Sequence, residues 1–159
     1  MKTVHELGQP EKDRVLAWVR YLLVAFRCSQ WSVQLAELLV QPSEDEDPCV
    51  AQIHTHNENH IAMLQLCANW AQYSEGEKRH TLVHEILHLV GKEQDRIVNA
   101  WFSQLSEGDV GFAMVQYAEA YERFIDQLAF IMGYQLPDWS ALPLSAATDM
   151  RVAEEGMLW

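Results

Sequence analysis

The sequence predicts one α+β domain with a short mixed sheet of three or four strands, an N-terminal helix, a central apolar helix and a long later helix. The chain has 159 residues, of which 49% are hydrophobic and 21% are charged, which suits a single domain with a sizeable core. Stretches with helical apolar spacing lie on both sides of a region where apolar and polar residues alternate, as they do in half-buried strands. No internal repeat divides residues 1–159, so we expect one domain.

Helices are expected at residues 10–27, 75–90 and 93–105, and a long helix is expected from an N-cap at Ser106 or Asp109 to about Met132. Pro10 suits a first helical turn. Ser74 and Glu77 have the spacing of a capping box, which places a helix start near residue 75. Gly91 is expected to end that helix in the left-handed conformation. Trp101 lies at helical core spacing, so we expect it to pack in the interior.

Strands are expected at residues 31–39, 49–56 and 60–67, the last two joined as a hairpin by a turn at 57–59. The acidic run at 42–48 is typical of a solvated loop. The core of the domain should then cover residues 10–132, followed by an extension at 134–159 with a short helix at 149–155.

The charge and the cysteines limit the partners and the compartment. A formal net charge of −12 argues against binding to nucleic acid and to anionic membranes. The N-terminus lacks the apolar stretch of a signal peptide, and the longest apolar region contains Arg20 and is too short to span a bilayer. Three cysteines without C-x-x-C spacing fit a reducing compartment. We therefore expect a cytoplasmic monomer.

The segment RHTLVHEILHLVGK, residues 79–92, is apolar on nearly every side and yet carries His84, Glu85 and His88. Polar groups in an interior cost several kcal/mol unless something satisfies them. Because His84 and His88 are four residues apart, both rings lie on one helix face and can bind one metal ion. Glu85 is placed to approach a water on that ion without binding the ion itself. The H-E-x-x-H spacing therefore predicts a metal site.

Catalytic zinc usually has three protein ligands and one water. HEILHLVG matches the start of the metzincin pattern, but the position that should carry the third ligand is Gln94, so that class is rejected. Glu122 is the better third ligand, with Glu119 in reserve. Glu122 and Asp126 share one helix face that should be partly buried, where a pair of carboxylates favours a cation.

HExxH followed by a separate ExxxD helix resembles the gluzincins, the thermolysin-like zinc metallopeptidases. TLVHEILHLV with ERFIDQLA is similar to small phage-type and bacterial zincin-like proteins, the minimal gluzincins. The resemblance covers residues 10–132 and implies a zincin-like fold and hydrolysis of peptide bonds in a peptide or protein substrate. It implies that Zn²⁺ is bound by His84, His88 and Glu122.

The same resemblance implies roles for the neighbouring residues. Glu85 would be the general base, and Asp126 would hydrogen-bond the ligand histidine His84 and fix its tautomer. The strand from His60 to Leu66 would be the cleft edge to which a peptide adds as an extra strand. That edge comprises Ala62, Met63 and Leu64. The donors considered for the oxyanion are Tyr117, Tyr121 and His80.

Three alternatives remain open. His54, His56 and His60 form a second metal site or, more simply, a polar end of the hairpin that faces solvent. In the second alternative, the chain is a zincin-like scaffold that binds peptide or protein without cleaving it, and zinc serves only the structure. In the third alternative, the H-E-x-x-H motif is a coincidence in a helical domain that binds no metal. No pattern in the sequence specifies the substrate.

Overall fold

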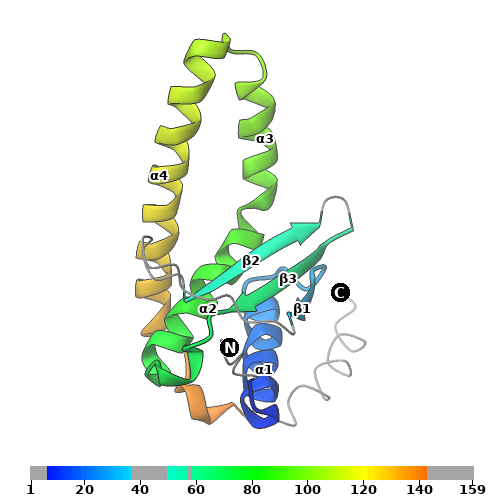
Figure 1. Cartoon of the computed structure of the whole chain (residues 1–159), viewed down its shortest axis with the longest axis vertical. Helices are drawn as coiled ribbons and strands as arrows, with labels where there is room; N and C mark the ends of the chain where they lie inside the picture. The colour runs from blue at the N-terminus through cyan, green and yellow to red at the C-terminus, as the bar shows by residue number, and fades with distance from the viewer. Residues whose placement is uncertain (1–6, 37–49, 57–58, 143–159) are drawn as a thin grey trace, which may run out of the picture.

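The computed structural model describes residues 7–36, 50–56 and 59–142. Figure 1 shows its α+β arrangement of four α-helices with one small sheet. The elements are α1 (Gln9–Ala25), β1 (Ser32–Leu35), β2 (Ala51–His56), β3 (Ile61–Leu66), the 3₁₀ helix η1 (Trp70–Gln72), α2 (Glu75–Val90), α3 (Lys92–Phe102), α4 (Glu107–Gly133) and the 3₁₀ helix η2 (Trp139–Ala141). The α+β class with a short mixed sheet is confirmed. The acidic run at 42–48 and the helix expected at 149–155 lie outside the described residues.

The sheet has three strands in the order β1-β3-β2. β3 pairs in parallel with β1 and antiparallel with β2, and the hairpin of β2 and β3 is as predicted. β1 lies within the segment 31–39 where a strand was expected, and residues 37–39 of that segment lie outside the described residues. Alternate residues of β3 are buried because one of its faces covers the helices.

The expectation that residues 60–66 form the cleft edge is wrong. β3 is the central strand, so Met63 pairs with Gln34 on one side and with His54 on the other. Ala62 and Leu64 are flanked in the same way. A strand whose main-chain groups are engaged on both sides cannot accept a further strand. Within the described residues, the end strand of the sheet on the side of His84 and His88 is β2.

The core lies between the sheet and the helices α1 and α2 (Figure 1). α1 contributes Val15, Trp18 and Leu22, all fully buried, as its helical spacing predicted. Trp139 closes one end of this core, because its ring stacks on Trp18 with centroids 5.5 Å apart. The indole N–H of Trp18 also donates to the Trp139 carbonyl at 2.9 Å. η2 is thereby fixed to the first helix.

The start of α2 is capped as predicted. The Ser74 hydroxyl accepts the Glu77 backbone N–H at 3.3 Å, and the Glu77 carboxylate accepts the Ser74 N–H at 2.8 Å. Lys78 in the next turn pairs with Glu11 of α1 at 2.8 Å. The cap and the ion pair together set where α2 begins and how it lies against α1.

The end of α2 differs from the prediction. Gly91 has φ −79° and ψ −4°, which is right-handed, so glycine is not there for a left-handed turn. A Cβ at this position would lie 1.7 Å from the Tyr121 hydroxyl oxygen. Glycine is needed because α4 passes close to the junction of α2 and α3.

α3 and the first part of α4 form an arm, residues 92–118, that extends away from the sheet (Figure 1). Between residues 90 and 124, no side chain that the structure describes is buried. Trp101 is 76% exposed, so its predicted core packing is wrong. α3 contacts α2 and α4, and none of its described residues belongs to the buried core. No described helix is long and apolar enough to cross a lipid bilayer.

Candidate metal centre

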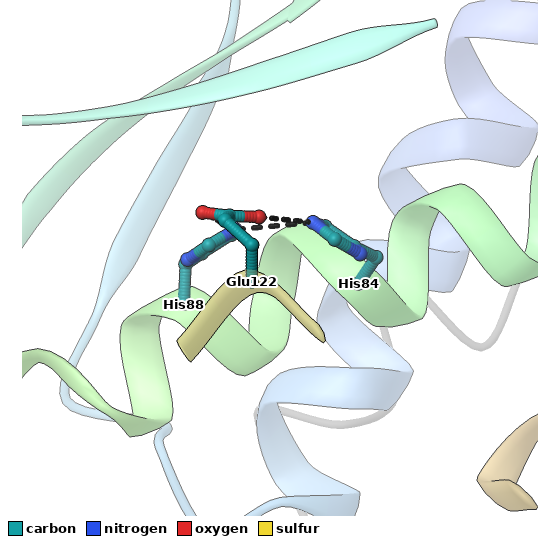
Figure 2. A group of neighbouring side chains, drawn as sticks. All are labelled: His84, His88 and Glu122. Carbon is teal, nitrogen blue, oxygen red and sulfur yellow. Dashed lines mark hydrogen bonds and ion pairs between the residues drawn. The ribbon is translucent and has the colours of Figure 1, made fainter. Parts of the chain in front are cut away.

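Two histidines of α2 and one glutamate of α4 converge beside β2. His84 and His88 lie on successive turns, and the Glu122 carboxylate lies across them (Figure 2). The two Nε2 atoms are 3.1 Å apart. Oε2 of Glu122 is 3.3 Å from Nε2 of His84, and Oε1 is 3.6 Å from Nε2 of His88. Three ligand atoms of the kinds that zinc prefers therefore surround one point.

These distances fit a tetrahedral ion. Ligand atoms about 2.0–2.1 Å from a tetrahedral zinc are about 3.3 Å from one another. The two Nε2 atoms are 3.1 Å apart, and the Glu122 carboxylate approaches His84 at 3.3 Å through Oε2 and His88 at 3.6 Å through Oε1, so these separations lie around that value. Burial also lowers the pKa of His88, which favours the neutral imidazole that binds metals. Among the described residues, His84, His88 and Glu122 are the three side chains whose ligand atoms lie close enough together to hold one metal ion.

The reserve ligand, Glu119, lies elsewhere. Its carboxylate is 3.9 Å from the Arg123 guanidinium one turn along α4, and it does not belong to the converging group. The structure thus brings Glu122 rather than Glu119 to the two histidines.

The expected burial of the carboxylates is wrong. The side chains of Glu122 and Asp126 are 56% and 63% exposed. α4 packs on α2 through Ile125 and Ala129, which are buried, and this leaves the two acids at the margin of the contact. The cost of burying them is therefore no argument for a cation, and the case for a metal rests on the geometry of the ligand atoms.

Asp126 lies next to His84, as expected, but hydrogen-bonds another histidine. Its Oδ1 is 3.6 Å from Nδ1 of His84, which is beyond hydrogen-bond distance. The same oxygen is 3.1 Å from Nε2 of His80. Asp126 is thus placed between two imidazoles that lie one turn apart on α2.

Glu85 lines the same cleft and faces β2, where the Ile53 backbone hydrogen-bonds its carboxyl group. It is only 8% exposed, and burial raises the pKa of its carboxyl to about 8. A backbone hydrogen bond from Ile53 opposes this rise in pKa, and the charge of Glu122 adds to it. Without a cation nearby, Glu85 is therefore mostly protonated at pH 7.

A cleft of about 510 Å³ connects these groups. β2 forms one wall, and α2, the start of α3 and α4 form the others. The lining residues are Ala51, Gln52, Ile53, His54, Thr55, His84, Glu85, His88, Lys92, Asp95 and Glu122. Lys92 and Asp95 were not foreseen, although Lys92 continues the four-residue spacing of His84 and His88. Ala62, Met63 and Leu64 are not among the lining residues.

The three expected oxyanion donors do not line this cleft. The Tyr117 hydroxyl donates to Asp95 at 2.9 Å, and burial and this bond raise its pKa to about 12. The Tyr121 hydroxyl is buried beside Gly91 without a hydrogen-bond partner, and burial raises its pKa as well. His80 is engaged with Asp126.

The three histidines of the hairpin do not converge on a common point. His54 lines the cleft and has its Nε2 3.1 Å from Oε1 of Gln65. His56 and His60 are exposed and line a separate cavity of about 520 Å³ near Trp31. They form no metal-binding group in the described part of the chain.

Comparison with known proteins finds no matching family model, no matching curated protein and no matching solved structure. Inferences about function are therefore drawn from the residues of the cleft and from their geometry.

Proposed function

We propose that this chain is a zinc-dependent metallopeptidase of the gluzincin type, built on a zincin-like fold. One observation carries the proposal. His84, His88 and Glu122 converge with the spacing of a tetrahedral zinc site, and the buried Glu85 lines the same cleft. Three protein ligands leave the fourth position free, which distinguishes catalytic zinc sites from closed structural ones.

When bound, zinc would supply a water acidic enough to lose a proton near pH 7 and would polarise a substrate carbonyl. The neutral imidazoles of His84 and His88 and the carboxylate of Glu122 would hold the ion. The positive charge would also favour the ionised form of Glu85 over the protonated form found in its absence.

Glu85 would be the general base. It would take the proton from the water whose oxygen forms the new C–O bond, and would then give that proton to the leaving amine as the C–N bond breaks. Its hydrogen bond with Ile53 occupies one carboxylate oxygen, so the other remains to face the water. The same bond fixes the carboxylate between α2 and β2.

The substrate would be a peptide or protein segment in extended form. β2 is the end strand of the described sheet and borders the cleft, so a peptide could pair with its outward-facing groups and cross the metal centre. This assigns to β2 the role that the sequence suggested for β3. Main-chain pairing gives affinity with little dependence on side chains, so it leaves the preferred residues unspecified.

The test begins with zinc content, measured by elemental mass spectrometry on untagged protein purified without added metal. We expect about one zinc per chain in the wild type and in Glu119→Ala, and much less in His84→Ala and Glu122→Ala. No zinc in the wild type would refute the proposal.

Hydrolysis is then measured on a mixed peptide library by mass spectrometry. Glu85→Gln should keep its zinc and lose the cleavage products. Undiminished cleavage by Glu85→Gln would remove this residue from the mechanism. Zinc binding without cleavage in the wild type would favour the non-catalytic, peptide-binding scaffold instead.

A further inference from the structure

We propose that His80 is a positioning residue of this metal centre, which holds Asp126 in place so that Asp126 can orient His84. The inference rests on the proposed zinc site. It starts from one carboxylate oxygen, Oδ1 of Asp126, which is 3.1 Å from Nε2 of His80 and 3.6 Å from Nδ1 of His84.

Two pairs of a histidine and an acidic residue follow each other along the contact of α2 and α4. His80 lies one turn before His84 on α2, and Asp126 lies one turn after Glu122 on α4. Because the helices run alongside each other, the pair of His80 and Asp126 forms a second link next to the pair of His84 and Glu122.

Asp126 needs such a link. Its side chain is 63% exposed, so packing alone leaves it several rotamers. The buried neighbours Ile125 and Ala129 fix the backbone of α4 but do not restrain this carboxylate. The hydrogen bond from His80 holds the carboxylate against α2. An ionised carboxylate oxygen can accept more than one hydrogen bond, so Oδ1 remains available to His84.

The consequence for His84 concerns its tautomer. When Nδ1 carries the proton and donates to Asp126, Nε2 has a free lone pair. Nε2 is the atom that faces Glu122 and His88, 3.3 and 3.1 Å away. Holding the Asp126 carboxylate beside Nδ1, 3.6 Å away, therefore favours the form of His84 that binds a metal.

The test measures the zinc dissociation constant of the full chain by competition with a chromogenic chelator. Partners that contact a ligand directly typically change metal affinity 10–100-fold. We expect Asp126→Ala to weaken binding about tenfold and His80→Ala about three- to tenfold. His80→Gln should retain most of the affinity, because its amide N–H can replace the imidazole donor. His56→Ala, which removes an exposed histidine away from the cleft, is the matched control.

A double-mutant cycle shows whether His80 acts through Asp126. If it does, His80→Ala combined with Asp126→Ala should bind zinc no more weakly than Asp126→Ala alone. Nitrogen-15 NMR of the metal-free protein gives an independent readout. His84 should be protonated at Nδ1 in the wild type and should shift toward the Nε2 tautomer in His80→Ala.

Three results would overturn the proposal: additive losses in the cycle, an unchanged affinity in His80→Ala, or an equal loss in His80→Gln and His80→Ala. In each of these cases, a wild type with one tightly bound zinc would leave the proposed function intact. A wild type that binds no zinc would overturn both proposals.

Discussion

Glu85 is the residue whose chemistry depends most on its surroundings. Its carboxyl is 8% exposed, and its pKa rises from 4.5 to about 8 because burial disfavours the charged form. Between these two pH values the unfolded chain releases the proton while the folded, metal-free protein keeps it. The folded state therefore loses stability through this group as the pH rises across that interval.

Glu85→Gln should remove this loss, because a neutral amide has no proton to release. In the presence of a chelator, we expect the variant to be more stable than the wild type by about 3 kcal/mol at pH 7. The difference should vanish below pH 4.5. Urea unfolding of both proteins at several pH values measures this difference. If the free energies of unfolding of the two proteins changed in parallel with pH, the raised pKa of Glu85 would be contradicted.

A second prediction concerns the contact of Gly91 with Tyr121. Gly91→Ala should lower the free energy of unfolding by about 1–3 kcal/mol, because the new Cβ would lie 1.7 Å from the Tyr121 hydroxyl oxygen. Tyr121→Phe should be nearly neutral, since the hydroxyl it removes is buried without a partner.

The double variant provides the control. Tyr121→Phe should reduce the cost of Gly91→Ala but not abolish it, because the Cζ atom of the ring would still be 2.8 Å from the new Cβ. Strictly additive losses, measured by chemical denaturation, would show that the two residues are not in contact.

At the scale of the elements, local signals in the sequence were sufficient for α2 and for the hairpin. The start of α2 follows from the hydrogen bonds of Ser74 and Glu77, which involve residues only three apart. The periodicity of α1 likewise predicted its buried face. The convergence of His84, His88 and Glu122 could be predicted because His84 and His88 share a helix face, and because a separate acidic helix was available to supply Glu122.

The errors arise where the outcome depends on distant parts of the chain. The order β1-β3-β2 places the last strand in the middle, which no local pattern of residues 60–67 reveals. Gly91 is required by a side chain of α4, and Trp101 is exposed because α3 lies outside the core formed by the described residues. The exposure of Glu122 and Asp126 similarly depends on how α4 rotates against α2.

The outward-facing N–H groups of β2 lead to a prediction about how a peptide pairs with this strand. Ile53 donates its backbone N–H toward Glu85, away from β3, so the N–H of Thr55, two residues along the strand, also faces the cleft. If a peptide pairs with this edge, Thr55→Pro should reduce kcat/KM up to about tenfold through loss of a donor, with zinc content unchanged.

His54→Pro is the matched control, because its N–H faces β3 and its loss should instead destabilise the sheet. Circular dichroism and thermal unfolding separate the two effects. Full activity in a folded Thr55→Pro variant would mean that the substrate does not pair with β2 at this position.

At the scale of the whole molecule, the proposed zinc would join α2 to α4. A ligand that binds only the folded state stabilises it, by about 2.7 kcal/mol at a hundred times its dissociation constant. For a chain of 159 residues, chelation under those conditions should lower Tm by roughly 5–10 °C. Differential scanning fluorimetry with and without chelator measures the shift, and a shift of the same size in Glu122→Ala would contradict this origin.

The exposure of the arm, residues 92–118, affects how often its helical hydrogen bonds open. Because no described side chain between residues 90 and 124 is buried, helical hydrogen bonds there can open without disturbing the core. Amide hydrogens of the arm should therefore exchange with solvent far faster than those of α1 or β3. Glu122 lies at this boundary, one helical turn before the first buried residue of α4, Ile125. Slow and fast exchange thus meet at Glu122, and binding of a metal by this proposed ligand should extend protection from the core toward the arm.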